Sequence, residues 1–246
     1  MLLENKNILI TGAGKGIGES CVSNCIQNGG YVFALIKSNK DNKKFSKNKK
    51  IKIYNGDVRN KKLILKIFDD SKKIKRPINC IINNAGLRFR KKFLKINEKE
   101  LKEILDVNYL SIFHILQIFS KFVIKKKIKG SIVNMSSIVG KLGFKELSGY
   151  AASKGALTAL TKSYAVEMSD YGIRANTISP GFIKTSFYEK FKKDKKNLYK
   201  WTLSRVPQKR WGNPSEIAEL ASFLLSNKSN YINGEDISID GGWTNA

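Results

Sequence analysis

A tyrosine and a lysine four positions apart, with a serine thirteen positions before the tyrosine, are the residues of this chain best suited to acid–base chemistry. Tyr150 and Lys154 stand at the start of a segment expected to be helical, where this spacing puts both side chains on one face. A free phenol has a pKa of about 10, and lowering it by roughly 3 units requires about 4 kcal/mol of stabilisation of the phenolate. A nearby ammonium in a desolvated pocket supplies this. We therefore expect Tyr150 to exchange a proton with a carbonyl or alcohol oxygen, and Lys154 to lower its pKa.

The serine pair Ser136 and Ser137 ends a strand-like run over residues 130–137. Parallel sheets place their sites at this edge of the strands. A hydroxyl beside the phenol would orient and polarise the oxygen that exchanges the proton. The spacing to Tyr150 favours Ser137 over Ser136 for this role.

A glycine-rich turn near the N-terminus, TGAGKGIG at residues 11–18, predicts a phosphate-binding site. Gly12 allows a tight turn out of a strand, Gly16 lets the backbone approach a pyrophosphate, and Gly18 lets the following helix pack closely on a sheet. The start of that helix supplies unpaired N–H groups and a partial positive charge. The turn therefore predicts a bound dinucleotide.

Apolar runs alternate with helix-length segments along the whole chain, which predicts parallel strands covered by helices on both faces. We expect an α/β fold, a single doubly wound Rossmann domain over 1–246 with a seven-stranded parallel sheet flanked by helices. Residues 182–212 interrupt the alternation with an aromatic-rich stretch and are interpreted as a substrate lid. The expected strands are 7–11, 31–36, 51–58, 79–86, 130–137, 173–181 and 235–242, and the expected helices are 16–28, 61–72, 98–125 and 150–171.

With these motifs in this order, the chain resembles the classical short-chain dehydrogenase/reductase family over essentially its full length. The matching pieces are TGAGKGIG, Asp57-Val58, NNAG at 83–86, Asn108, Ser137, Tyr150 with Lys154, Pro180-Gly181 and Thr185. The resemblance implies an oxidoreductase that interconverts a carbonyl and a secondary alcohol by hydride transfer. It also implies that Asn108 joins Ser137, Tyr150 and Lys154 in the catalytic set by holding a water that links Lys154 to solvent.

The same resemblance implies a set of cofactor contacts. Asp57 and Val58 would border the adenine, the NNAG segment the ribose and nicotinamide, and Lys154 the nicotinamide ribose, while Ile183 would seal the ring from its other side. The full set is Gly12, Lys15, Gly16, Ile17, Gly18, Lys37, Asp57, Val58, Asn84, Ala85, Gly86, Tyr150, Lys154, Pro180, Gly181, Ile183 and Thr185.

The choice between NAD(H) and NADP(H) rests on the end of the second strand, where family members that use NAD carry an acidic residue. This chain has Ile36 there, followed by Lys37, and Lys15 precedes the second glycine of the phosphate turn. Neither position would repel a 2′-phosphate, and a charge-assisted contact is worth roughly 1.5–3 kcal/mol. We therefore favour NADP(H) over NAD(H).

Two substrate classes remain open within the resemblance. The chain as a whole is similar to 3-oxoacyl-(acyl-carrier-protein) reductases, which dock an acidic carrier protein on basic residues. At the matching positions this chain has Ile128 and Tyr171, although Lys127 and Lys129 flank the first. This departure weakens the thioester alternative.

The other class is a sugar or sugar acid, because NNAGLRFRKKF (83–93) and RVPQKRWG (205–212) are similar to segments of gluconate 5-dehydrogenases. Arg88 and Arg90 follow the NNAG turn and, with Lys141 or Lys145, would pair with a carboxylate, which arginine does bidentately. We favour a small polar or anionic keto or hydroxy compound, with Ser137, Tyr150, Arg88 and Arg90 as its contacts.

The composition restricts the remaining classes of function. The net charge is +26, with 39 lysines and only seven arginines, so the excess is dispersed lysine and specific nucleic-acid recognition is not expected. A non-catalytic polyanion-binding or cofactor-sensing protein on the same fold remains an alternative. The three cysteines form no metal motif, so no metal is expected.

The apolar runs are short, so we expect a cytoplasmic protein without membrane spans. The helices expected at 98–125 and 150–171 carry apolar faces beyond what covers the sheet, and family members usually pair through them. We therefore expect a homotetramer or homodimer.

Overall fold

The computed structural model describes residues 1–38, 45, 48–186 and 188–246, and its centre is a seven-stranded parallel sheet in the order β3-β2-β1-β4-β5-β6-β7. The predicted α/β fold with a seven-stranded parallel sheet is therefore confirmed. The strand order reverses between β1 and β4, which opens a crevice beyond their carboxyl ends. The strands are β1 (Asn7–Thr11), β2 (Tyr31–Ile36), β3 (Ile51–Asn55), β4 (Cys80–Asn83), β5 (Gly130–Met135), β6 (Ile173–Pro180) and β7 (Asp236–Ile239).

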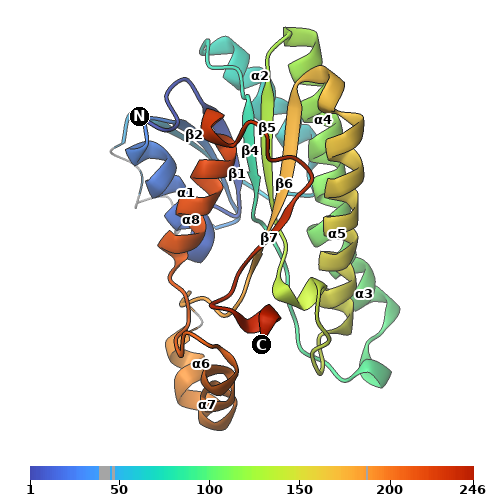
Figure 1. Ribbon diagram of the computed structural model, residues 1–246. Coiled ribbons are helices and arrows are strands. Elements are labelled where there is room, and N and C mark those ends of the chain that lie inside the picture. Colours follow the sequence, from blue (N-terminus) through green and yellow to red (C-terminus); the bar gives the residue numbers. More distant parts are fainter. Residues whose placement is uncertain (39–44, 46–47, 187) are drawn as a thin grey trace.

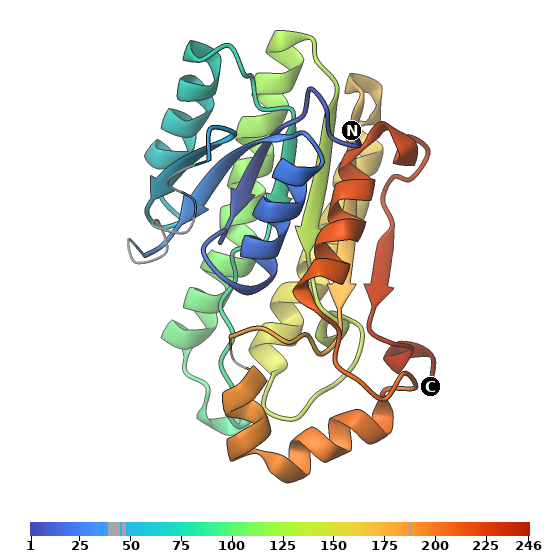
Figure 2. The ribbon, with the colours of Figure 1, turned by 90° about the vertical axis from the view of Figure 1, so that its left-hand side faces the viewer.

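Helices cover both faces of the sheet (Figures 1 and 2). The helices α1 (Gly16–Gln27) and α8 (Pro214–Leu225) lie on one face, and α2 (Lys61–Lys73), α4 (Ser111–Lys126) and α5 (Ser148–Glu167) lie on the other. Successive strand residues point to opposite faces of the sheet and contribute to two hydrophobic cores. Ile8 and Ile10 pack toward α1 and α8, while Leu9 packs toward α2 and α4. Both layers of apolar side chains are fully buried, which explains why the strands read as continuous apolar runs.

The predicted helix over 98–125 contains a wider turn near its middle. It consists of α3 (Glu98–Leu105), a π-helical turn at Asp106–Leu110, and α4. By length and composition alone this continuous segment, Glu98–Lys126, would suffice to cross a membrane, and 44% of its most apolar window is buried inside the protein. A helix that packs into a protein core meets the same test, and α4 buries Ile112, Ile115 and Phe119.

The aromatic-rich segment forms two helices, α6 (Tyr188–Asp194) and α7 (Lys196–Arg205), beyond the carboxyl ends of the strands. The chain end lies close by in Figure 1, after a 3₁₀ turn at Trp243–Asn245. Trp211 packs against the rings of Tyr188 and Phe191 at centroid distances of 5.1 and 5.2 Å. The other short 3₁₀ turns are Phe93–Lys95, Ile138–Gly140, Ser169–Tyr171 and Asn227–Ser229.

Two features depart from the sequence prediction. The sequence prediction did not include helix α8, which the structure contains. Four strands also end two or more residues earlier than predicted, namely those expected at 51–58, 79–86, 130–137 and 235–242. The extra residues form turns at the carboxyl edge, because the chain leaves the sheet there to build the site. The loop 39–50 and its lysine run, 43–50, lie largely outside the described residues.

Candidate active site

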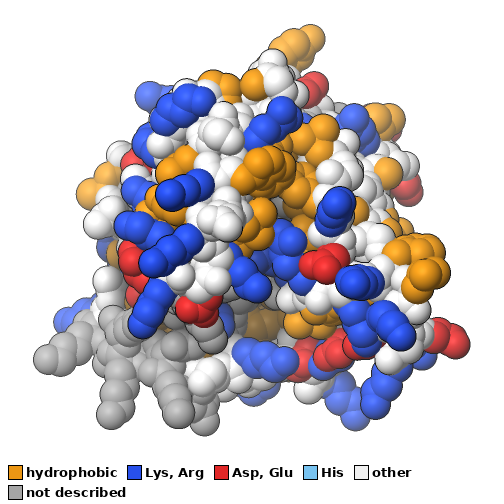
Figure 3. Space-filling view, turned by 90° about the horizontal axis from the view of Figure 1, so that it is seen from below, with side chains coloured by type: hydrophobic (Ala, Val, Ile, Leu, Met, Phe, Trp, Pro, Cys, Tyr) orange, Lys and Arg blue, Asp and Glu red, His pale blue; other side chains and the backbone are white. Residues whose placement is uncertain are grey.

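A cavity of about 350 Å³ opens at the carboxyl ends of the central strands. It brings together segments that are far apart in the sequence: the turn after β1, the loops after β4, β5 and β6, the start of α5, and the α6 region. Of the predicted site residues, those that line it are Ile17, Asn84, Gly86, Arg88, Arg90, Ser137, Tyr150, Lys154, Pro180, Gly181, Ile183 and Thr185. Figure 3 views this side of the molecule and shows lysine and arginine side chains with apolar side chains between them.

The turn between β1 and α1 has the geometry that a dinucleotide pyrophosphate requires. Gly12 and Gly16 have φ values of +65° and +57°, which side chains with a Cβ rarely adopt. Lys15 occupies the N-cap of α1 in an extended conformation, and no side chain caps the helix start. The first N–H groups of α1 are thus left available for an anion, as the glycine pattern predicts.

The NNAG segment is held against this turn by hydrogen bonds. Asn84 Nδ2 donates to the carbonyl oxygens of Thr11 and Gly12 at 3.2 and 3.0 Å. The hydroxyl of Thr11 accepts from the backbone N–H groups of Asn84 and Ala85, both at 3.1 Å. Thr11 is buried and belongs to β1. The sequence analysis did not identify its role, although its place just before Gly12 was the available signal.

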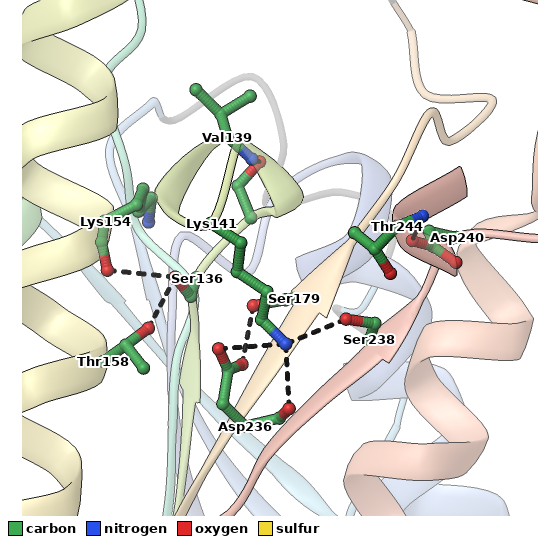
Figure 4. Close-up of polar contacts among 11 residues, drawn as sticks. Ser136, Val139, Lys141, Lys154, Thr158, Ser179, Asp236, Ser238, Asp240 and Thr244 are labelled. Carbon is green, nitrogen blue, oxygen red and sulfur yellow. Dashed lines mark hydrogen bonds and ion pairs between the residues drawn. The ribbon is translucent and has the colours of Figure 1, made fainter. Parts of the chain in front are cut away.

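Tyr150 and Ser137 meet inside the cavity. Both residues line it, the Ser137 hydroxyl acts to lower the pKa of the Tyr150 phenol, and Ser137 Oγ accepts from the backbone N–H of Val139 at 3.2 Å. Ser136 turns away from Tyr150, because its hydroxyl donates to the backbone carbonyl of Lys154 at 3.1 Å and contacts Thr158 (Figure 4). The hydroxyl of Ser136 is therefore engaged with α5, and the choice of Ser137 stays a prediction.

Lys154 is 3% exposed, and its ammonium donates to the carbonyl oxygen of Met135 at the end of β5, at 2.6 Å. Its Nζ lies 5.7 Å from the centroid of the Tyr150 ring. Burial lowers the pKa of Lys154 from 10.5 to about 8. Lys154 therefore lines the same cavity as Tyr150, but its ammonium donates its hydrogen bond to the backbone and not to the phenol.

The pKa of Tyr150 is raised in this structure, whereas the sequence led us to expect that Lys154 lowers it. Burial raises the pKa of the phenol, and the positive charge of Arg88 and the Ser137 hydroxyl oppose that rise without overcoming it. Arg88 is the cation that acts on the pKa of Tyr150 in this arrangement. Arg88 follows the NNAG turn, as the substrate assignment requires, and lines the cavity.

Asn108 lies in the π-helical turn between α3 and α4 and is fully buried. Its Oδ1 accepts from the N–H of Leu87 at 2.7 Å, and its Nδ2 donates to the Leu87 carbonyl at 2.8 Å and to Ser153 Oγ at 3.0 Å. These bonds fix the chain just after NNAG. A Cβ built on Gly86 would lie 3.5 Å from Asn108 Oδ1 and 3.8 Å from Lys154 Nζ, so both side chains border this glycine.

The ends of β2 and β3, where the adenine was expected, carry an ion-pair cluster. Asp57 accepts two hydrogen bonds from the guanidinium of Arg59, at 2.7 and 2.9 Å, and Lys37 Nζ lies 4.0 Å from its carboxylate. The hydrogen bonds from Arg59 lower the pKa of Asp57 to about 2. Arg59 was not among the predicted residues, although it stands two positions after Asp57. Its charge offsets the carboxylate and leaves Lys37, which is 83% exposed, as a cation at this edge.

Lys141 is not available to pair with a substrate in the way that was expected. Its ammonium lies 3.2 Å from the buried carboxylate of Asp236 and donates to Ser238 Oγ at 2.9 Å (Figure 4). Asp236 also accepts from Ser179 Oγ at 2.6 Å. This cluster ties the loop after Ser137 to β6 and β7, so Lys145 remains the lysine of this loop that can face a ligand.

The rest of the cavity wall is mainly apolar. Phe182 and Trp211 pack at a centroid distance of 5.1 Å, and Phe144 and Phe191 complete that side. Phe182, Phe191 and Trp211 lie in the segment 182–212 that was predicted to form a lid, whereas Phe144 comes from the loop after Ser137 and was not predicted. Among the described residues no group of three or more His, Cys, Asp and Glu side chains could hold a metal ion.

Comparison with known proteins places the chain among enzymes that carry out oxidation and reduction. The profile of the family described as Enoyl-(Acyl carrier protein) reductase matches residues 12–244. The chain is 34% identical over 247 residues to a 3-oxoacyl-(acyl-carrier-protein) reductase from Thermotoga maritima, covering 98% of this chain and 99% of that protein. It is 34% identical over 166 residues to 5-keto-D-gluconate 5-reductase from Escherichia coli strain K12, covering 68% of this chain and 65% of that protein.

A solved structure from Agrobacterium tumefaciens, described as a 2-deoxy-D-gluconate 3-dehydrogenase with bound NADP, superposes with a TM-score of 0.90. It is 29% identical to this chain, and the match covers 99% of this chain and 98% of that one. The chain belongs to the short-chain dehydrogenase/reductase family. It is an oxidoreductase that acts on CH–OH or carbonyl groups and binds a nicotinamide cofactor.

Replacing Gly18 with alanine is expected to weaken cofactor binding about tenfold or more. A Cβ at this position would overlap the carbonyl oxygen of Gly12 and lie 2.6 Å from Asn84 Nδ2, so the phosphate turn must shift. Overpacking of this kind costs about 1–3 kcal/mol of folding free energy. Calorimetric titration with NADPH and thermal melting measure both effects. Gly143→Ala is the control, since nothing lies within 4 Å of a Cβ there, and equal behaviour of the two variants would refute this account of the turn.

Proposed function

We propose that the protein reduces a carbonyl to a secondary alcohol, or the reverse, with Tyr150 as the proton donor and acceptor. The observation that carries this is one cavity lined by Tyr150, Ser137 and Lys154 together with Asn84, Gly86 and Pro180. In reduction, Tyr150 gives its proton to the substrate oxygen, while the Ser137 hydroxyl donates a hydrogen bond to that oxygen. The bound nicotinamide supplies or accepts the hydride.

We propose that Lys154 and Arg88 support the phenolate that this transfer leaves behind. Arg88 already favours the charged phenol through its own charge. Lys154 needs only to move its ammonium from the Met135 carbonyl toward the ring, 5.7 Å from its centroid, or toward a ribose hydroxyl of the cofactor. The pKa of about 8 lets this amine return a proton near neutral pH.

Asn108 is proposed to hold the water that links Lys154 to solvent. Both N–H groups of its amide are engaged, with Leu87 and Ser153, and its Oδ1 has one acceptor position left beside Gly86. That position and Lys154 Nζ border the same glycine. The amide therefore serves the relay as an acceptor and also fixes the loop that carries Arg88.

We propose that the residues expected to contact the cofactor, which run in chain order from the glycine turn at 11–18 to Thr185, do so. We add Arg59, which is paired with Asp57. We propose NADP(H) as the preferred cofactor because no carboxylate follows β2 within the described residues, and Arg59 offsets the charge of Asp57. Lys37 and Lys15 are exposed cations at this edge. The bound NADP in the Agrobacterium tumefaciens structure is consistent with this choice.

Changing Lys37 to alanine is expected to raise the Kd of NADPH about tenfold and to leave that of NADH unchanged, since only NADPH carries the 2′-phosphate. Fluorescence titration with both cofactors measures the two constants. Lys228→Ala removes an equally exposed lysine far from the cofactor edge and should alter neither. Tighter binding of NADH than NADPH by the unaltered protein would exclude the proposed preference.

The substrate is proposed to be a small polar or anionic keto or hydroxy compound such as a sugar acid. Arg88 and Arg90 line the cavity, and no carboxylate among the described residues does. The match to a 3-oxoacyl-(acyl-carrier-protein) reductase over 98% of the chain keeps acyl thioesters as the second candidate. NADPH oxidation with 5-ketogluconate, acetoacetyl thioesters and simple ketones separates them. A strong preference for the thioester would overturn the first assignment, and no turnover with any carbonyl would favour a cofactor-sensing or polyanion-binding role.

We further propose that residues 1–246 form one domain in which 182–212 close over the substrate, since Phe191 and Trp211 line the cavity. Pairing through α4 and α5 into a homodimer or homotetramer is supported by exposed apolar residues on and beside them, Ile124 at 39% and Val166 at 78%. Sedimentation equilibrium checks this, and a stable monomer would contradict it. A cytoplasmic location stays a prediction.

A further inference from the structure

A second pocket lies beside the cavity that contains Tyr150. The loop after Ser137, helix α7 and the C-terminal 3₁₀ turn form its walls. Arg90 and Phe144 line both spaces, so the two are adjacent and share a wall. The lining residues are Arg90, Leu142, Gly143, Phe144, Lys145, Leu198, Trp201, Arg205 and Trp243.

Three aromatic rings, those of Phe144, Trp201 and Trp243, line this second pocket. Trp243 is 3% exposed and stacks on Phe144, with a centroid distance of 6.0 Å and an interplanar angle of 28°. Trp201 meets the edge of Trp243 at 5.4 Å and is itself 47% exposed. Aliphatic or aromatic groups of a ligand pack well on such surfaces. A half-exposed tryptophan at the mouth is a group that a ligand would cover.

Three cations stand around these rings. The guanidinium of Arg205 lies over the Trp243 ring, 5.7 Å from its centroid, and Arg90 and Lys145 face the pocket from the other side. No carboxylate lines the pocket, and among the described residues none of the three forms an ion pair. Glu146 acts on Arg90 only at longer range, and burial together with the charge of Arg88 lowers the pKa of Arg90. An anion is the ligand group that would relieve this accumulation of positive charge.

The loop that carries part of this wall is held in place. The backbone N–H of Lys91 donates to the carbonyl of Glu146 at 3.0 Å, and the Lys91 ammonium pairs with Glu100 at the start of α3. Lys141 fixes the other end of the loop on Asp236. Arg90 and Lys145 are thus attached to anchored backbone, which suits them to position a ligand group.

We propose that this pocket binds the distal end of the substrate. The ligand is an elongated oxo or hydroxy acid whose reacting carbon lies at Tyr150, whose apolar or planar middle lies on Phe144 and Trp243, and whose carboxylate pairs with Arg205 and Lys145. Arg90, at the shared wall, contacts the ligand between the two spaces. The inference rests on the proposed function and narrows its substrate class from small anionic compounds to longer ones with a remote anion.

The test compares methyl-ketone acids of increasing length, from 4-oxopentanoate to 8-oxononanoate, with their neutral methyl esters. The kcat/KM of NADPH-dependent reduction should favour the long acids over their esters by about tenfold or more, and the short acid much less. Arg205→Gln and Lys145→Gln should each reduce this preference, because they should lower kcat/KM for the long acids far more than that for the esters. Lys200→Gln, an exposed lysine on α7 that does not line the pocket, is the matched control.

A second readout does not depend on turnover. Nonanoate, which has no reactive carbonyl, should quench tryptophan fluorescence through Trp201 and Trp243, and Arg205→Gln should weaken its binding about tenfold. Equal kcat/KM for long acids and their esters, or binding of nonanoate that Arg205→Gln leaves unaltered, would overturn the inference. If no carbonyl is reduced but nonanoate binds through Arg205, the proposed function fails and the second pocket stands.

Discussion

Replacing Tyr150 with phenylalanine is expected to lower kcat/KM for carbonyl reduction about a thousandfold, while the Kd of NADPH stays within about threefold of its original value. The phenol hydroxyl stands in the cavity that Ser137 also lines, where it can give a proton to a substrate oxygen. Acid–base catalysis by a positioned side chain contributes about 10²–10⁴-fold, and the loss should fall in that range. Steady-state rates of NADPH oxidation and a binding titration measure the two effects.

Tyr164 offers a matched control on the same helix. Its hydroxyl contacts Ser120 Oγ at 2.6 Å, away from the cavity, and burial raises its pKa to about 12. Tyr164→Phe removes one buried hydrogen bond, with a cost of about 1 kcal/mol in stability, and should leave turnover unchanged. Turnover that survives in Tyr150→Phe, or falls equally in both variants, would refute the role of Tyr150.

Exchanging Lys154 for methionine should abolish turnover and make the protein more stable at pH 7. The ammonium is 3% exposed, and its hydrogen bond to the Met135 carbonyl is the one that holds it. Its pKa falls from 10.5 to about 8, which means that folding disfavours its charged form. At pH 7 this opposes folding by on the order of 3 kcal/mol. Loss of the hydrogen bond offsets about 1–2 kcal/mol of that gain.

The sign of the pH dependence follows from the lowered pKa. Below pH 8 the buried amine is charged in the folded and unfolded chains, and the whole penalty is present. Between pH 8 and 10.5 the folded protein loses the proton first, so the stability of the unaltered protein approaches that of the variant. Chemical denaturation across this range checks the convergence. Lys162→Met, an exposed position on α5, should show no such trend, and a less stable Lys154→Met variant at pH 7 would contradict the account.

The sheet was predictable because its strands are buried on both faces and each is followed by a turn or a helix of recognisable period. Helix α8 was missed although its start carries clear signals, with Asn213 as N-cap, Pro214 in the first turn and Glu216 completing a capping box. The π-helical turn at Asp106–Leu110 has no local signature beyond the polar Asn108 in an apolar helix. It forms because the Asn108 side chain bonds to Leu87, a contact between distant segments.

The residues of the candidate site were predictable where a local motif carries them, as at Gly12 and Tyr150. The orientation of their side chains was not predictable, because it depends on residues that are distant in the sequence and adjacent in the fold. The ammonium of Lys154 bonds to Met135, and Lys141 is held by Asp236 near the other end of the chain. The second pocket likewise depends on Trp243 meeting Phe144, which no spacing in the sequence reveals.

We propose that hydride passes from a nicotinamide to a carbonyl carbon in this cavity while Tyr150 supplies the proton. Incubation of the protein with NADPH that carries deuterium at both C4 positions and with the panel of keto acids, followed by mass spectrometry of the products, tests this. We predict an alcohol that carries one deuterium on the former carbonyl carbon with the unaltered protein, and about a thousandfold less of it in the same time with Tyr150→Phe. The absence of deuterated alcohol from every carbonyl, in a folded protein that binds NADPH, would contradict it.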